Sequence, residues 1–233
     1  MGKRGPKPRR KKPVEWSSNL AYAIGLIATD GSLSKNGRHI ELTSKDRGQL
    51  QTFMRCLDIE VKIGIKKGYA DKTANRVQFG DVVFYDFLLE IGLTPNKTKT
   101  IGALDIPDKY FFDFLRGHHD GDGSFHSYWD KRWKSSFMFY LIFVSASKEH
   151  VDWLRSKLER FLDVRGHITH GRTATVYQLK YAKAESLKII KNMYYSNTVP
   201  CLKRKRVKIF KALRRAGNLT KFAQVLKLVD ISP

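Results

Sequence analysis

The chain of 233 residues carries 44 Lys and Arg against 22 Asp and Glu, which gives a formal net charge of +22. Hydrophobic residues make up 42% of the sequence and aromatic residues 12%, enough to bury a core, so disorder of the whole chain is excluded. The longest apolar run, residues 137–144, is too short to cross a membrane. A folded and strongly basic chain most often binds nucleic acid, because neutralising phosphates releases condensed counterions.

Residues 1–15 are predicted to form a flexible basic arm. Residues 1–13 contain seven Lys or Arg, three Pro and two Gly, and they show no apolar periodicity. Folded structure is expected from Trp16 onward. The polar residues 17–19 offer helix N-caps before the apolar stretch 20–27, which predicts a helix that ends at the Asp-Gly-Ser triplet 30–32.

Residues 16–105 are assigned to a first repeat. After the first helix, Ile40 and Leu42 alternate with polar neighbours and predict a strand over residues 38–43. The sequence then indicates, in order, a helix with apolar residues at 50, 53, 54 and 57, strands over 61–65 and 76–79, and a helix over 82–91. The segment 94–107 contains Pro95 and Pro107 and little apolar sequence, so it is predicted to join two units.

Residues 106–200 repeat this order as a second unit. A helix over 110–120 ends at the Asp-Gly-Ser triplet 122–124, which lies 92 residues after the first triplet. There follow a strand over 137–144, a helix with apolar residues at 151, 154, 158 and 161, strands over 166–170 and 174–180, and a further helix. The recurrence predicts an α+β protein made of two pseudo-twofold-related copies of a helix-strand-strand-helix-strand-strand-helix unit.

Residues 201–233 are predicted to form a basic helical extension. Eight Lys and Arg fall between residues 203 and 215, with Val207, Ile209 and Leu213 along one apolar edge. A second short helix is expected over residues 220–229.

The helices that precede the two triplets each have a face of small residues. Ala21, Gly25 and Ala28 share one face of the first helix, and Gly117 and Gly121 share one face of the second. Such faces allow two helix backbones to pack closely. If these helices pair about a twofold axis, Asp30 and Asp122 meet at one end. One triplet alone would indicate only a turn after a helix.

Paired carboxylates favour a metal site, because two negative groups at short range repel unless a proton or a cation lies between them. Oxygen ligands favour Mg²⁺, with Mn²⁺ as a possible substitute, and the backbone carbonyls of Thr29 and Gly121 could complete the site. In a protein that binds phosphates, such a centre is suited to hydrolysis of a phosphodiester bond.

Residues 23–31 and 115–123 resemble the two motifs of the LAGLIDADG homing endonucleases, of the monomeric two-motif kind. By order of elements the resemblance extends over residues 16 to about 210. It implies that the motif helices form the central interface, that Asp30 and Asp122 are the catalytic metal-binding pair, and that curved antiparallel sheets form a saddle in the DNA major groove. It further implies a monomer that makes a staggered cut in both strands of a long, specific double-stranded DNA target.

The second motif departs from the family pattern at two histidines. His118 and His119 stand where the family has apolar residues, and the variable earlier acidic position holds Ala28 in the first motif and Asp120 in the second. A joint metal site of His118, His119 and Asp120 is not expected, because adjacent helical residues point about 100° apart. The histidines are predicted to pack or to hydrogen-bond at the helix surface.

Members of the family usually keep a basic residue beside each active centre, near the end of each repeat. That resemblance selects Lys97 and Lys205 as further catalytic residues. In a chain with 44 basic residues, chance proximity is the competing interpretation.

Polar residues that alternate with apolar ones on the strands are predicted to face DNA, where Arg, Lys and Gln can read base edges. They are Arg38, His39, Glu41, Lys62, Lys66, Arg76, Gln78, Arg165, His167, Gln178 and Lys180. A hairpin loop over 127–136 adds Lys131, Arg132 and Lys134 beside Trp129 and Trp133, and the extension adds Lys203 and Arg204. Each is equally compatible with a solvated surface position.

The two cysteines, Cys56 and Cys201, lie far apart and form no metal-binding spacing. This favours an intracellular, reducing compartment, either bacterial or archaeal cytoplasm or an organelle. The alternative function is nucleic-acid binding without cleavage, by an intron RNA-splicing maturase, which can keep both aspartates, or by a transcription factor. A transcription factor of this kind would normally add a helix-turn-helix module, for which the residues after 200 are few.

Overall fold

The computed structural model describes residues 14–67, 73–133, 135–171 and 175–217. Several predicted features lie outside these residues: most of the basic arm, Lys134 and the helix over 220–229.

The first repeat is a four-stranded antiparallel sheet with three helices. Its elements, in chain order, are α1 (Ser18–Asp30), β1 (Gly31–Leu33), β2 (His39–Ser44), α2 (Arg47–Leu57), β3 (Gly64–Lys67), β4 (Thr73–Gly80) and α3 (Val82–Glu90). The strands lie in the order β1-β2-β4-β3.

The second repeat has the same topology. After two short 3-10 turns, η2 (Lys97–Lys99) and η3 (Asp108–Tyr110), its elements are α4 (Phe111–Gly121), β5 (Ser124–Trp129), β6 (Phe137–Ser145), α5 (Lys148–Leu162), β7 (His167–Thr169), β8 (Tyr177–Tyr181) and α6 (Lys183–Met193). The strand order is β5-β6-β8-β7. The predicted α+β class and the duplicated unit are therefore confirmed.

Equivalent local signals set the helix ends in both repeats. Asp46 and Ser147 cap α2 and α5 by accepting hydrogen bonds from backbone N–H groups of the first turn. The same two helices end at Asp58 and Asp163, which adopt left-handed backbone angles with φ of 51° and 50°. Aspartate tolerates this region better than most residues, so each helix stops at a matching position.

Strand alternation separates a buried from an outer face in each sheet. In β2, Ile40 and Leu42 are buried while His39, Glu41 and Thr43 are half-buried on the other face. In β6, Phe139, Leu141 and Phe143 are buried in the same way. The helices α5 and α6 pack against β6 and β8, so the core of the second repeat lies between this helical layer and the sheet.

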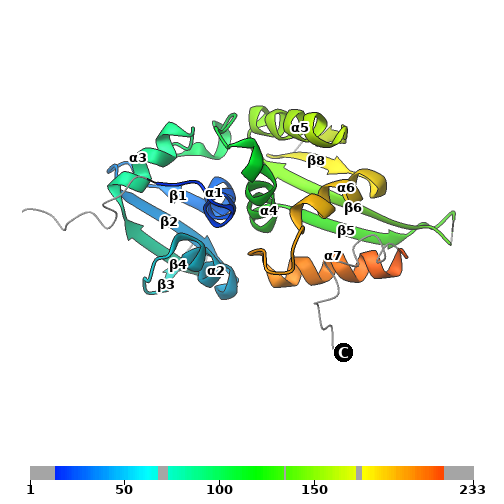
Figure 1. The fold of residues 1–233 in the computed structure, drawn as a ribbon, viewed down its shortest axis with the longest axis horizontal. Helices are drawn as coiled ribbons and strands as arrows, with labels where there is room; N and C mark the ends of the chain where they lie inside the picture. Colours follow the sequence, from blue (N-terminus) through cyan, green and yellow to red (C-terminus); the bar gives the residue numbers. More distant parts are fainter. Residues whose placement is uncertain (1–13, 68–72, 134, 172–174, 218–233) are drawn as a thin grey trace, which may run out of the picture.

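The centre of the molecule is the pair of helices α1 and α4, with one sheet on each side (Figure 1). A Cβ atom added at Gly117 would overlap the carbonyl oxygen of Tyr22, and one added at Gly25 would overlap that of Phe114. The predicted packing of the two small-residue faces is confirmed, because only glycine at these positions allows so close an approach.

Some boundaries differ from the prediction. Residues 127–129 continue β5 and pair with residues 137–139 of β6, so the loop between these strands is shorter than expected. The extension begins as a single helix, α7 (Lys203–Arg215), which buries Ile209 and Leu213 but leaves Val207 exposed. Within the described residues, none of the helices combines the length and the apolar character that crossing a bilayer requires.

Candidate functional site

The two motif aspartates lie at the same end of the central helix pair. Asp30 is the last residue of α1, and Asp122 is the C-cap of α4. Gly121 lies directly against the end of α1, since a Cβ atom built on it would overlap the Thr29 hydroxyl and come within 3.2 Å of Asp30 Oδ2. The absence of a side chain at Gly121 therefore lets the two acidic ends meet.

The protein environment raises the pKa of both carboxyl groups. Burial, together with the charge of Asp122, raises the pKa of Asp30 to about 6 against the opposing effect of Lys205 and Lys97. Partial burial against the protein also raises the pKa of Asp122, although part of this residue remains accessible to solvent. Two partly desolvated carboxyl groups that repel each other are the arrangement that a divalent cation would relieve.

The structure brings both predicted lysines to this pair. Lys97, in η2, is buried, and its Nζ donates a hydrogen bond of 2.5 Å to the carbonyl oxygen of Gly31. Lys205, in α7, donates to the carbonyl oxygens of His119 (2.6 Å), Gly121 (3.0 Å) and Gly123 (2.6 Å). Burial lowers the pKa of each lysine to about 8, while Asp30 and Asp122 oppose that shift.

The donors available to a metal are two carboxylates rather than a closed cage. No group of three or more His, Cys, Asp and Glu side chains that could hold a metal occurs in the part of the chain that the structure describes. Lys205 donates to the Gly121 carbonyl that we expected as a ligand. The part of the Thr29 carbonyl as a ligand stays a prediction. The set fits Mg²⁺, which is commonly held by one or two carboxylates with water and substrate phosphate as its other ligands.

A shallow groove of about 850 Å³ runs past Asp30. Thr43 of β2 and Gly121 of α4 line it, and Arg204 lies at its side with Nε 3.5 Å from Asp46 Oδ2. The groove is therefore formed by both repeats, with a basic residue from the extension beside the acidic centre.

Asp120, which the sequence left without a role, is a buried anchor. Its Oδ2 accepts hydrogen bonds from Tyr22 Oη (2.9 Å) and from the backbone N–H of Leu202 (2.6 Å), and its backbone carbonyl accepts one from Gln49 Nε2 (3.2 Å). Burial raises the pKa of Asp120 to about 6. Asp120 thus joins α4 to α1, to α2 and to the residue that precedes α7. No pattern in the sequence predicts these partners, since they lie far from it along the chain.

His118 and His119 pack and hydrogen-bond as predicted, but in the core and not at an exposed helix surface, since both are buried. The ring of His118 stacks on that of His150 at 5.2 Å, and His119 Nε2 lies 3.4 Å from the carbonyl oxygen of Ser124. Burial lowers the pKa of His119 to about 3 and that of His118 well below the ordinary value. Neutral histidines here fill core space between α4 and the elements β6 and α5 of the same repeat.

The predicted DNA-facing residues of the first repeat share the outer face of its sheet. Cross-strand pairs place Glu41 opposite Gln78 and Thr43 opposite Arg76. Glu41 is bound by Lys66 Nζ at 2.5 Å and by Arg76 Nη1 at 3.5 Å. His39 also lies on this face, while Arg38 and Lys62 are exposed just before β2 and β3.

In the second repeat the predicted DNA-facing residues do not all lie on the outer face of the sheet. Gln178, Lys180 and His167 lie on the outer face, since they alternate with the buried residues Leu179 and Tyr181 of β8 or pair across from it. Arg165 does not share that face, because its guanidinium binds Glu159 of α5 at 2.8 Å, on the side of the helical layer. Lys131 and Arg132 are exposed in the β5–β6 connection.

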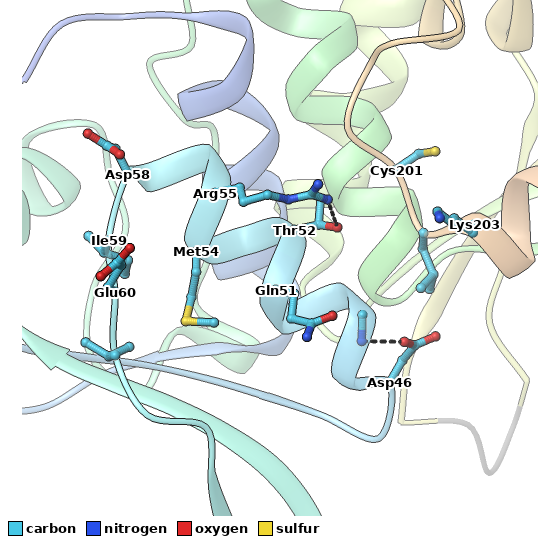
Figure 2. A pocket seen from close by; sticks show the side chains of 13 residues that line it. Asp46, Gln51, Thr52, Met54, Arg55, Asp58, Ile59, Glu60, Cys201 and Lys203 are labelled. Carbon is cyan, nitrogen blue, oxygen red and sulfur yellow. Dashed lines mark hydrogen bonds between the residues drawn. The ribbon is translucent and has the colours of Figure 1, made fainter.

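A second groove, of about 740 Å³, lies between α2 and the segment that enters α7 (Figure 2). Arg55 bonds Thr52 within α2, and Cys201 and Lys203 face them from the other wall. Lys203 therefore lines this groove rather than the outer face of a sheet.

Two α+β repeats that pack through glycine-faced helices, with an aspartate at the same end of each, define the two-repeat LAGLIDADG architecture. The comparisons agree with this class. Residues 17–92 match the family model described as a LAGLIDADG-like domain. The first repeat therefore carries that domain, and the resemblance expected from the two motifs is confirmed.

Solved structures show the same fold over most of the chain. The LAGLIDADG meganuclease I-AabMI bound to uncleaved DNA is 14% identical with a TM-score of 0.57, covering 88% of this chain and 92% of that one. Mesophilic variants of the homing endonuclease I-DmoI are 19% identical with a TM-score of 0.52, covering 79% and 94%. Full-length DUF199/WhiA from Thermatoga maritima is 16% identical with a TM-score of 0.53, covering 90% and 67%. No curated protein matches the chain.

Proposed function

We propose that the protein is a site-specific double-stranded DNA endonuclease that holds a divalent metal, Mg²⁺ or Mn²⁺, between Asp30 and Asp122. The observation that carries the proposal is the meeting of one aspartate from each repeat at one end of the central helix pair, with a lysine beside them from each side. The similar fold of I-AabMI, a LAGLIDADG meganuclease bound to uncleaved DNA, supports the same function.

The metal, when bound, would polarise a phosphoryl oxygen, activate a water molecule and stabilise the leaving oxygen. Asp30 and Asp122 would hold it, because the two carboxyl groups lie at one end of the helix pair and Asp122 acts on Asp30 as a like charge. Lys97 and Lys205 would add fixed positive charge next to the scissile phosphates. Both ammonium groups are held by backbone carbonyls, so little reorganisation is needed when charge develops on the phosphate.

One chain supplies both halves of this centre, which is why we propose a monomer that cuts both strands. β1 begins directly after Asp30 and β5 begins two residues after Asp122, so each outer sheet face extends from the acidic pair. A duplex centred on the pair would contact both sheets. The excess of 22 positive charges would hold its phosphates.

The test uses a randomised duplex DNA library incubated with the full chain and Mg²⁺, followed by sequencing of the cut ends. Defined ends with a constant stagger are expected. Asp30→Asn and Asp122→Asn should each lower the cleavage rate by at least about 10²-fold and leave DNA affinity largely intact. Asp58→Asn, at a helix C-cap away from the pair, is the matched control and should cut at the wild-type rate.

Two outcomes would redirect the proposal. Wild-type cleavage by either Asp30→Asn or Asp122→Asn would overturn the site assignment. Tight binding of DNA or RNA without cutting, in both Mg²⁺ and Mn²⁺, would instead favour the non-cleaving alternative, such as a maturase.

A further inference from the structure

The outer faces of the two sheets differ chemically at equivalent positions. The serines that follow the two motifs set the correspondence: Ser32 pairs with Glu41 across β1 and β2, and Ser124 pairs with Ile142 across β5 and β6. Glu41 and Ile142 are therefore equivalent. Counting two residues in each direction makes His39 equivalent to Tyr140 and Thr43 equivalent to Val144.

The first sheet is polar along this central strand. Glu41 takes part in ion pairs with Lys66 and Arg76, and the Thr43 hydroxyl donates to Glu41 at 3.4 Å. Such a face offers hydrogen-bond donors and acceptors that base edges can match.

The central strand of the second sheet is apolar on both faces. Besides its buried phenylalanines, β6 places Met138, Tyr140, Ile142 and Val144 on the outer face, each with part of its surface exposed. The ring of Tyr140 stacks with that of Tyr128 on β5, at 6.5 Å and 9° between planes. Among the described residues of the four strands, Lys180 is the one Lys, Arg, Asp or Glu on this outer face.

Exposed aromatic residues lie at one end of this surface. Tyr128 on β5 is 38% exposed and shares the outer face with Tyr140, and Trp133 in the β5–β6 connection is 71% exposed. Trp129 is 52% exposed but lies on the opposite face, because it pairs with the buried Phe137. A contiguous apolar surface on a protein of net charge +22 indicates a contact site. Lys131 and Arg132 beside it are suited to phosphate contacts and not to a purely apolar partner.

We infer that the second sheet recognises its half of the DNA target through thymine methyl groups, whereas the first sheet recognises the other half through hydrogen bonds and charge. The inference rests on the proposed function. In the major groove the thymine methyl is the apolar feature of the base edges, and apolar side chains select it. An RNA duplex would not serve, because its deep and narrow major groove excludes side chains.

The test begins with selection of a preferred duplex by the full chain in EDTA, so that binding is measured without cutting. Thymines in one half at a time are then replaced by deoxyuridine, which removes only the methyl group. In the half bound by the second sheet, each contacted methyl should be worth up to about fourfold in affinity. In the other half the same replacement should change affinity by less than about 1.5-fold.

Substitutions on β6 connect this effect to the sheet. Val144→Thr, which conserves shape, and Ile142→Thr, which is smaller, keep a β-branched residue on the strand and should reduce the difference between thymine and deoxyuridine. Thr43→Val, at the position equivalent to Val144, is the reciprocal control and should leave that difference unchanged. Val144→Thr conserves shape and so remains informative if Ile142→Thr does not fold.

The outcomes separate this inference from the proposed function. Specific binding that is equally sensitive, or insensitive, to deoxyuridine in both halves would overturn the thymine inference and leave the endonuclease proposal standing. Failure to select any duplex would overturn both. Retention of the full deoxyuridine effect in both Val144→Thr and Ile142→Thr would show that another surface contacts the methyl groups and would overturn the inference.

Discussion

Lys97 and Lys205 bind equivalent carbonyl oxygens in the two repeats. Lys97 Nζ donates to Gly31 at 2.5 Å, and Lys205 Nζ donates to Gly123 at 2.6 Å, where each glycine directly follows its motif aspartate. The two lysines reach these positions from unrelated elements, η2 and α7. The twofold symmetry of the centre therefore includes its positive charges as well as its carboxylates.

Replacement of either lysine by Met, which keeps a similar length without the charge, should lower the single-turnover cleavage rate by about 10²–10³-fold. The physical reason is loss of a preorganised positive group where phosphate charge develops. DNA affinity should change little, because one of many basic contacts is removed. The exposed Lys99 and Lys203 are the matched controls. An equal loss of rate in Lys99→Met and Lys97→Met would mean that general charge, not position, is responsible.

The helix interface predicts a large effect of one methyl group. Gly117→Ala places a Cβ atom on the carbonyl oxygen of Tyr22, a backbone atom that cannot rotate away. The two helices must separate, so the free energy of unfolding should fall by about 3 kcal/mol, as measured by urea denaturation. Gly48→Ala is the control, since its added Cβ would approach only the flexible side chain of Asp46 at 3.2 Å. Equal stability of Gly117→Ala and the wild type would contradict the close packing.

The duplicated fold and the acidic pair were predictable because their signals are local. Asp-Gly-Ser triplets 92 residues apart, glycine spacing on a helix and period-two alternation in residues 38–43 each require only neighbouring residues. The resemblance to a family added the lysines, and the structure places both at the carboxylates.

The rest depends on contacts between distant segments. Asp120 is anchored by Tyr22 and Leu202, which lie 98 and 82 residues away, and no periodicity reports such pairs. The burial of His118 and His119 could not be predicted, because histidine is a polar residue and the rings that enclose the pair, His150 and Phe143, lie far along the chain. The apolar outer face of the second sheet, in contrast, could have been predicted from the sequence. Residues 137–144 are all apolar, whereas a strand with one solvated face alternates.

The anchor at Asp120 can be separated from the acidic pair by two substitutions. Asp120→Ala leaves Tyr22 Oη and the Leu202 N–H buried without a partner, so the free energy of unfolding should fall by about 3 kcal/mol. Because Leu202 precedes α7, Lys205 should lose its position and the cleavage rate should fall as well. Asp120→Asn retains an oxygen acceptor and should keep most of both. A comparable loss of cleavage in Asp120→Asn and Asp30→Asn would contradict a purely structural role.

The buried histidines should make stability depend on pH. The neutral ring of His150 donates from Nδ1 to the carbonyl oxygen of Gly102 at 2.8 Å, and it stacks on His118 and Trp153. Burial, with a smaller effect of the charge of Lys97, lowers the pKa of His150 to about 4 against the opposing effect of the backbone hydrogen bond to Gly102. The raised pKa values of Asp30 and Asp120 act in the opposite direction between about pH 4 and 6. The contribution of His150 is therefore visible only as a difference between variants.

His150→Gln should show this difference directly. Below the ordinary histidine pKa of about 6.5, His150 binds a proton in the unfolded chain but not in the folded one. The free energy of unfolding of the wild type therefore falls relative to that of the variant as pH falls toward 4. Between pH 7.5 and 5 the difference in unfolding free energy should move by about 2 kcal/mol in favour of His150→Gln. Urea denaturation at several pH values measures it, with the exposed His167→Gln as control. A constant difference across that range would show that His150 takes up a proton as readily in the folded as in the unfolded chain, which its buried position beside His118 opposes.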